Sequence, residues 1–218
     1  MLEQLQNQLI VSCQPITGGP MDSPSIVAAM ASAAIAGGAS AVRIEGIRNV
    51  EAVRTVTDRP IIGIVKVDLD SSPVRITPHS QDIRDLISAG ADIIAFDATD
   101  RTRPEPVEAL LHTVQSLGAY SMADCSCLSD GKSAHALGAD ILASTLSGYT
   151  SGSVPATPDL ALVRQLATLD KFIIAEGRYN SPESAAAALT AGADAVVVGT
   201  AITRTEVVTG WFREAIHR

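Results

Sequence analysis

Short apolar runs recur along the whole chain, and each is bounded by glycine, proline or small polar residues. Four of them follow a glycine at the end of a predicted helix, in the segments IAGGASAVRIEG, ISAGADIIAFDAT, ALGADILASTLSG and TAGADAVVVGTAI. Their glycines, Gly38, Gly90, Gly138 and Gly192, lie 52, 48 and 54 residues apart. This spacing is about twice the length of one strand-and-helix unit, so a second strand is expected inside each interval.

A second set of apolar runs supplies those strands: IVSCQ, PIIGIVKVD, AYSMADC and KFIIAEGR. Between the strands, Ser23-Pro24 and Ser181-Pro182 are typical of helix starts, and VEALLHTVQSLG places its apolar residues along one helical face. Strand and helix thus alternate eight times. Right-handed crossovers and the even spacing favour a closed (β/α)8 barrel, an α/β TIM barrel, over an open doubly wound sheet. We expect one such domain over residues 1–218.

Composition narrows the class of protein further. Apolar residues make up 46% of the chain but aromatic residues only 3%, which predicts a core of Ala, Val, Ile and Leu. A net charge of −8 argues against nucleic acid as a partner. The odd set Cys13, Cys125 and Cys127 indicates free, buried thiols in a reducing compartment. With no signal peptide and no apolar run of membrane-spanning length, we expect a cytoplasmic, soluble protein that does not bind membranes.

The polar residues that end the apolar runs are the candidates for ligand binding, because parallel α/β folds bind ligands at the carboxyl ends of their strands. In chain order they are Gln14, Arg43 with Glu45, Lys66 with Asp68, Asp97, Asp124, Thr145 with Tyr149, Glu176 with Arg178, and Gly199 with Thr200. A barrel strand is buried on both faces, so the hydrophobic pattern does not tell which of these point inward.

The last two strands end in segments that predict a phosphate site, IIAEGRYNSP and VVVGTAITRT. Gly177 and Gly199 allow backbone N–H groups to approach an anion closely, and a short helix after the last strand adds oriented dipoles. Arg178, Thr200 and Arg204 complete this candidate site. The alternative is that the two glycines only permit tight turns.

Lys66 and Glu176 end the third and seventh strands, which lie opposite each other in an eight-stranded barrel. Acid and base groups on two sides of a ligand suit inversion of a carbon beside a carbonyl. Burial would lower the pKa of Lys66 and raise that of Glu176, while Asp68 would raise that of the lysine. Which group is the acid and which is the base stays open. The alternative to a catalytic Lys66 is a structural lysine that reaches solvent or pairs with a carboxylate.

The remaining strand ends add ligand contacts but no cofactor site. Gln14, Arg43 and Asp124 are expected to bind hydroxyl, carbonyl or amide groups, although Arg43–Glu45 and Lys66–Asp68 are alternatively internal ion pairs. The histidines lack metal-ligand spacing, and PITGGPMDSP after the first strand lacks the dinucleotide fingerprint. We predict no metal and no organic cofactor.

In these residues the chain resembles the N-acetylmannosamine-6-phosphate 2-epimerase family of sialic-acid catabolism. The resemblance covers nearly the whole chain and rests on LIVSCQ, AVRIEG, PIIGIVK, DIIAFDATDRTRP, MADCS, TLSGYT, IAEGRYNSPE and VVVGTAITR. It implies barrel enzymes that interconvert N-acetylmannosamine 6-phosphate and N-acetylglucosamine 6-phosphate, with no metal and commonly as homodimers.

The resemblance also assigns roles to the candidate residues. Lys66 and Glu176 would be the acid–base pair at C2 of a phosphorylated amino sugar opened to its aldehyde. Gln14, Arg43 and Asp124 would hold the sugar and its N-acetyl group, and Arg204 with the Gly199-Thr200 turn would hold the 6-phosphate. Tyr149 is a further candidate for sugar binding, and Gly177 and Arg178 are further candidates for phosphate binding. Arg43 is also a candidate donor to O1 of the enolate.

One segment departs from the family pattern, and two other functions compete. After the lysine the family more often has Arg-Asp-Tyr, whereas this chain has Val67-Asp68-Leu69, so the loop that follows is expected to alter substrate access, affinity or oligomer contacts. The alternatives are another phosphosugar epimerase or isomerase barrel, and a non-catalytic regulator that binds a phosphosugar.

Overall fold

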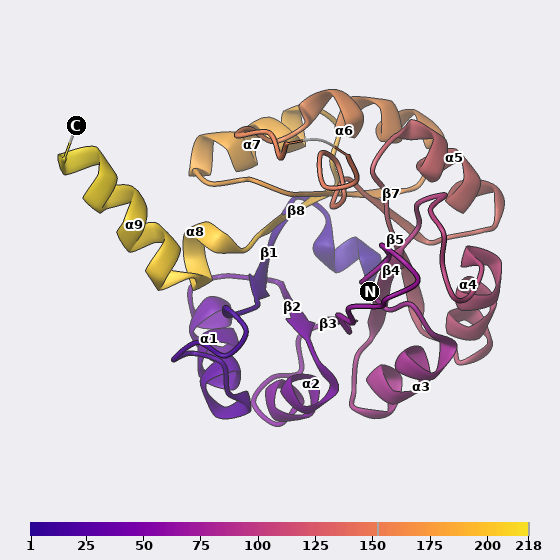
Figure 1. Ribbon diagram of the computed structural model, residues 1–218, viewed down its shortest axis with the longest axis horizontal. Helices are drawn as coiled ribbons and strands as arrows, with labels where there is room; N and C mark the ends of the chain where they lie inside the picture. The colour runs from indigo at the N-terminus through magenta and orange to yellow at the C-terminus, as the bar shows by residue number, and fades with distance from the viewer. Residues whose placement is uncertain (152, 218) are drawn as a thin grey trace.

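The fold is a closed barrel of eight parallel strands in the order β1 to β8, each paired with its neighbours and β8 paired back to β1 (Figure 1). The computed structural model describes residues 1–151 and 153–217. The strands are β1 (Gln8–Cys13), β2 (Ala41–Glu45), β3 (Ile61–Ile64), β4 (Ile93–Asp97), β5 (Tyr120–Asp124), β6 (Ile141–Ala143), β7 (Phe172–Glu176) and β8 (Ala195–Val198). The predicted (β/α)8 barrel is confirmed.

Helices follow the strands and cover the outside of the barrel (Figure 1). They are α1 (Pro24–Ala36), α2 (Ile47–Arg54), α3 (Ser80–Ser88), α4 (Val107–Ser116), α5 (Leu128–Ala136), α6 (Leu160–Leu166), α7 (Pro182–Thr190), α8 (Thr200–Thr203) and α9 (Thr205–Ile216), with short 3-10 helices at Leu2–Leu5 and Ala167–Leu169. Ser23 and Ser181 are N-caps, each followed by proline in the first turn, as the sequence predicts. Gly38 and Gly192, both with φ +104°, turn the chain from helix to strand.

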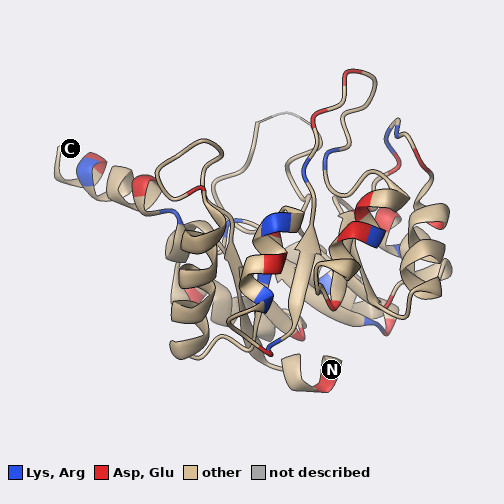
Figure 2. Cartoon of the chain, turned by 90° about the horizontal axis from the view of Figure 1, so that it is seen from below, with Lys and Arg blue, Asp and Glu red and all other residues tan. Residues whose placement is uncertain are grey.

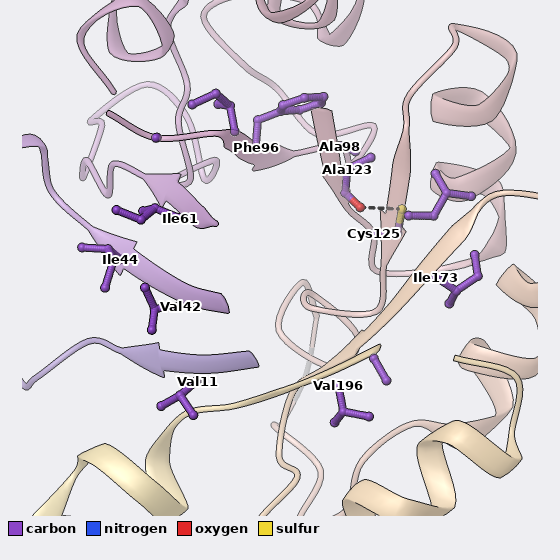
Figure 3. Close-up of a cluster of buried hydrophobic side chains, with 14 of the residues drawn as sticks. Val11, Val42, Ile44, Ile61, Phe96, Ala98, Ala123, Cys125, Ile173 and Val196 are labelled. Carbon is purple, nitrogen blue, oxygen red and sulfur yellow. Dashed lines mark hydrogen bonds between the residues drawn. The ribbon is translucent and has the colours of Figure 1, made fainter. Parts of the chain in front are cut away.

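Side chains alternate between two apolar layers along each strand, which settles which residues point into the barrel. One cluster contains Val42, Ala123 and Ala175 and packs between strands and helices; Figure 3 shows part of this outer layer. The other fills the barrel with Ile10, Ala41, Ile62, Met122 and Ile174. Side chains two residues after members of the inner cluster therefore also point inward, at the carboxyl ends of the strands.

The C-terminal helix α9 projects away from the barrel, as two perpendicular views show (Figures 1 and 2). None of its residues is buried, and the apolar side chains of Phe212 and Ile216 are 69% and 78% exposed. Near its start, an apolar groove of about 380 Å³ opens on the barrel surface. The groove is lined by Leu9, Val11, Met21, Met30, Ala33, Ala34, Gly37, Ile202, Thr203 and Thr205.

Other surface features bear on the composition-based expectations. Acidic and basic side chains are interspersed over helices and loops in the view of Figure 2. Among residues 1–151 and 153–217, no helix is both long and apolar enough to cross a membrane. All three cysteines are free, and Cys13 and Cys125 are buried as expected. The expectation for Cys127 is wrong: it is exposed, because it lies at the start of α5 and not inside a strand.

Candidate active site

A cavity of about 460 Å³ opens at the carboxyl ends of the strands. Of the residues predicted from the sequence, its lining includes Gln14, Lys66, Asp97, Thr145, Tyr149, Glu176, Gly177, Arg178, Gly199, Thr200 and Arg204. Further lining residues are Ser12, Pro73, Arg75, Ile76, Arg101, Leu146, Tyr179, Asn180, Val197 and Thr203. The fold thus brings most of the predicted site residues into one cavity.

Lys66 reaches the cavity from the end of β3. An isolated bridge to Ile76 fixes its backbone, and its Nζ donates a hydrogen bond to Oε1 of Gln14 at 2.6 Å. Gln14 is itself oriented by donating from Nε2 to Oγ of Ser12 at 2.7 Å. Burial lowers the pKa of Lys66, and the nearby positive charge of Arg43 lowers it further. The lysine is therefore held in place by a neutral amide and is easier to deprotonate than a lysine in water.

Glu176 enters the cavity from the opposite strand, β7. Its Oε2 accepts a hydrogen bond from Nη1 of Arg43 at 2.7 Å, and its backbone exchanges hydrogen bonds with the hydroxyl of Ser144. Burial raises the pKa of Glu176 to about 7, although the positive charge of Arg43 acts in the other direction. A carboxyl with a pKa near 7 is suited to both accepting and donating a proton at neutral pH.

Arg43 and Asp124 lie beneath Glu176. Their side chains are 1% and 0% exposed and are not among the residues that line the cavity. The Arg43 guanidinium donates to both carboxylate oxygens of Asp124, at 3.2 and 2.6 Å, and Oγ1 of Thr145 donates to the same carboxylate at 2.6 Å. A buried charge is costly unless it is paired, and here the two charges satisfy each other. In this arrangement both residues support Glu176 from below; their predicted contact with a ligand is untested.

The cavity wall near β7 and β8 contains the residues predicted to bind phosphate. Gly177 has φ +111°, and Arg178 follows it with φ +64°, an uncommon conformation for a residue other than glycine. The Arg178 side chain donates to the carbonyl oxygens of Thr157 and Ser147 at 2.8 and 2.6 Å, and lies over the ring of Tyr149 at 5.3 Å. These bonds hold the turn in its strained conformation.

On the β8 side, the backbone of Gly199 passes close to β1. A Cβ atom at Gly199 would lie 3.2 Å from Cβ of Ser12, which explains why a glycine suits this position. Arg204 donates from Nε to the carbonyl oxygen of Gln14 at 3.0 Å, and its side chain lines the cavity. Arg204 and the turn at Gly199 and Thr200 thus form one wall of the cavity, next to Gln14, which follows β1 and positions Lys66.

Sequence reasoning missed Ser12 and Arg101, both of which line the cavity. Ser12 precedes Gln14 by two residues, so strand periodicity alone places it on the same face. Arg101 follows Asp97 by four residues in a loop, where no such period applies. In the part of the chain that the structure describes, no group of three or more His, Cys, Asp or Glu side chains is arranged to hold a metal ion.

The fold and the cavity define a class: (β/α)8-barrel proteins with acid–base groups from opposed strands at the carboxyl ends. Comparison with known proteins gives the family. A family model described as "Putative N-acetylmannosamine-6-phosphate epimerase" matches residues 27–218. The chain belongs to this family.

Individual relatives agree with this assignment. A protein of Glaesserella parasuis named "Putative N-acetylmannosamine-6-phosphate 2-epimerase" is 59% identical over 216 residues, which cover 99% of this chain and 94% of the relative. One of the same name from Yersinia pestis is 59% identical over 215 residues, 99% of this chain and 92% of its own. The solved N-acetylmannosamine-6-phosphate 2-epimerase from Clostridium perfringens superposes with a TM-score of 0.96 at 40% identity, covering 99% of this chain and 96% of that one.

Proposed function

We propose that this protein interconverts N-acetylmannosamine 6-phosphate and N-acetylglucosamine 6-phosphate by removing and returning the proton at C2. The names of its relatives give the reaction. The observation within the chain that carries the proposal is the pair Lys66 and Glu176, which line one cavity from opposed strands and whose pKa values are shifted towards neutrality from opposite sides. Each positioned acid or base typically contributes about 10²–10⁴-fold to the rate.

In the proposed step, the sugar reacts in its open-chain aldehyde form. The C2–H bond breaks, the proton passes to the basic group on that face, and the electron pair moves to make a C1–C2 double bond and an oxyanion at O1. The acidic group on the other face then protonates C2, and the carbonyl reforms. In the reverse direction the two groups exchange roles, so Lys66 and Glu176 each act as acid in one direction and base in the other.

The wall formed by Gly177, Arg178, Gly199, Thr200 and Arg204 is the proposed site of the 6-phosphate. Arg204 supplies positive charge, and backbone N–H groups at the two glycine turns supply donors. With the phosphate held there, the sugar chain extends across the cavity towards β3, which brings C2 between Glu176 and Lys66. Tyr149, which lies against Arg178, would close this end of the cavity.

The buried network under Glu176 has a positioning role in this proposal. Arg43 fixes the orientation of the Glu176 carboxylate and is itself fixed by Asp124. Gln14 does the same for the Lys66 amine. The two reacting groups would thus be held at a fixed separation before the substrate enters, which lowers the cost of reaching the reactive geometry.

Conversion measured directly tests this function. Purified protein would be incubated with N-acetylmannosamine 6-phosphate and the mixture followed by NMR for the gluco epimer, without added metal. We expect conversion to an equilibrium mixture of both epimers from either starting sugar. Binding without any conversion would contradict the proposal and favour a non-catalytic phosphosugar-binding role.

We further propose that two copies of the chain form a dimer through α9. Within one chain the barrel has an open apolar groove beside β1 and α1, and α9 exposes the apolar side chains of Phe212 and Ile216. The helix after the last strand ordinarily covers this part of a barrel. If each copy places its α9 in the groove of the other, both apolar surfaces are buried in one symmetric contact.

The dimer is tested by light scattering coupled to size-exclusion chromatography. The chain should elute with a mass about twice its 22.6 kDa. Phe212→Glu, which places a charge on the apolar face of α9, should shift the protein to monomer, whereas Glu214→Gln on the same helix should not. A wild-type mass of one chain at micromolar concentration would contradict this proposal and leave the catalytic one intact.

A further inference from the structure

The segment DATDRTRP after β4 builds a charged cluster at the cavity that the proposed chemistry does not use. Asp97 ends β4 and points inward, two residues after Ala95 of the inner apolar cluster. One of its carboxylate oxygens accepts hydrogen bonds from the backbone N–H and hydroxyl of Thr99, at 2.9 and 2.6 Å. The other accepts from Nη2 of Arg101 at 2.5 Å. Both Asp97 and Arg101 line the cavity.

The guanidinium of Arg101 is held rigidly, yet one of its nitrogens is unused. Its Nε donates to Oγ1 of Thr99 at 2.9 Å, in addition to the bond from Nη2 to Asp97. Arg103 braces the same loop by donating to the carbonyl oxygens of Asp97 and Thr99 at 2.8 and 3.0 Å. Across residues 1–151 and 153–217, no hydrogen-bond acceptor contacts Nη1 of Arg101. A pre-oriented donor is therefore available to a molecule in the cavity.

The position of this donor indicates which part of a ligand it meets. In a closed eight-stranded barrel, β4 lies opposite β8, where Arg204 and the Gly199 turn form the proposed phosphate wall. A molecule anchored there by its phosphate presents its other end to β4. The Asp97 carboxylate lies against both Arg101 and, at 3.9 Å, Arg103, so Nη1 of Arg101 remains a charge-assisted donor to an oxygen acceptor of the ligand. In a 2-acylamino sugar 6-phosphate, the amide carbonyl beside C2 is such an acceptor.

We propose that Arg101 is a specificity-determining residue, which donates from Nη1 to the carbonyl oxygen of the substrate's acylamino group. The inference rests on the proposed function and adds to it the residue that distinguishes an acylated amino sugar from a plain sugar phosphate. A site built to bond a ligand group discriminates against analogues that lack the group, since its own polar atoms are then left unpaired.

The experiment is a binding cycle with two open-chain ligands that lack the aldehyde and so do not react: N-acetylglucosaminitol 6-phosphate and glucitol 6-phosphate. Calorimetry would give the affinity of each for the wild type, Arg101→Gln and Arg101→Lys. We expect Arg101→Gln to weaken the acylated ligand about tenfold or more, the effect of losing one charge-assisted hydrogen bond. Glucitol 6-phosphate should change by less than about twofold, because it lacks the acceptor. Arg101→Lys should resemble Arg101→Gln, since lysine keeps the positive charge but lacks the planar guanidinium with its several N–H donors.

Arg75→Gln is the matched control. Arg75 also lines the cavity, but it is largely exposed and pairs with the exposed Asp68, so its loss should weaken both ligands by a similar factor. An equal loss for both ligands in Arg101→Gln, or no loss, would overturn the inference.

The test also separates this inference from the proposed function. Binding of glucitol 6-phosphate shows that a variant is folded. If Arg101→Gln does not fold, the comparison of the two ligands is made with Arg101→Lys instead. A wild type that neither binds these ligands nor converts the sugar would overturn the proposed function as well. A wild type that converts it, with no preferential loss in the variants, would overturn only the role of Arg101.

Discussion

Two successive layers of side chains inside the barrel differ in polarity: one is apolar, and the next, at the carboxyl ends of the strands, is charged. In four strands an inward-facing residue of the inner apolar cluster is followed two positions later by an inward-facing charge: Ala41 and Arg43 in β2, Ala95 and Asp97 in β4, Met122 and Asp124 in β5, and Ile174 and Glu176 in β7. Lys66 follows Ile64, the last residue of β3, in the same way. The apolar layer gains free energy from burial, whereas the charged layer loses hydration and recovers it only through its pairing. One layer therefore maintains the barrel, and the other contains the groups to which we assign the proposed chemistry.

Removing the reacting groups of the charged layer should have the largest effect. Lys66→Ala and Glu176→Gln should each lower kcat by about 10²–10⁴-fold, because each removes one of the two groups that move the C2 proton. Steady-state kinetics measures the loss, and the affinity for glucitol 6-phosphate checks that the cavity is intact. Near-normal turnover in either variant would remove that residue from the mechanism.

Truncation of a side chain in the apolar layer should instead lower the stability of the fold. Ile174→Ala removes a fully buried side chain from inside the barrel and should lower the free energy of unfolding by about 2–5 kcal/mol. Ile174→Val, which removes one methylene, should cost only about 0.5–1.5 kcal/mol. Urea denaturation measures both. If Ile174→Ala were as stable as the wild type, the apolar layer would not have the role assigned to it.

A substitution in the proposed phosphate-binding wall should weaken substrate binding. Arg204→Ala should raise KM about tenfold or more while kcat changes little, since the phosphate is held equally in the ground state and the transition state. Lys132→Ala, which removes an exposed charge from α5, should leave both constants unchanged. A fall in kcat with unchanged KM in Arg204→Ala would place Arg204 at the reacting atoms instead.

The last prediction concerns the pH dependence of stability. Glu176 has a pKa raised from 4.5 to about 7, so between these values the folded protein binds a proton that the unfolded chain has released. The stabilisation is complete below about pH 4.5 and is lost as pH rises through about 7. Urea denaturation at several pH values should show a steeper fall in the wild type than in Glu176→Gln. Parallel curves would mean that Glu176 has an ordinary pKa.

The sequence predicts the barrel well because its signals are local and repeated. The glycines before four of the strands, the Ser-Pro helix starts and the short apolar runs each depend on neighbouring residues, and the structure confirms them. The strand ends predict the cavity because parallel strands bring their carboxyl ends together. Inward or outward orientation was not predictable, since both faces of each strand are apolar; the two packed clusters decide it.

What the sequence did not predict depends on contacts between distant segments. The hydrogen bonds from Arg43 to Asp124 and to Glu176, which join three separate strands beneath the cavity, could not be read from the sequence; the contact of Arg43 and Asp124 with a ligand stays a prediction. Arg101 was missed because its orientation depends on Asp97 and on a loop braced by Arg103. The outward course of α9 was not anticipated either, because an amphipathic pattern does not tell which surface will cover the apolar face.

We propose that Lys66 and Glu176 of the charged layer move the proton at C2 of the sugar. The most direct test of this proposal is incubation of N-acetylmannosamine 6-phosphate with the protein in deuterated buffer, followed by NMR at C2 of both epimers. We predict deuterium at C2 of the gluco product, and loss of that exchange in Lys66→Ala and Glu176→Gln. Conversion between the epimers without deuterium from solvent at C2, or no conversion at all, would contradict the account.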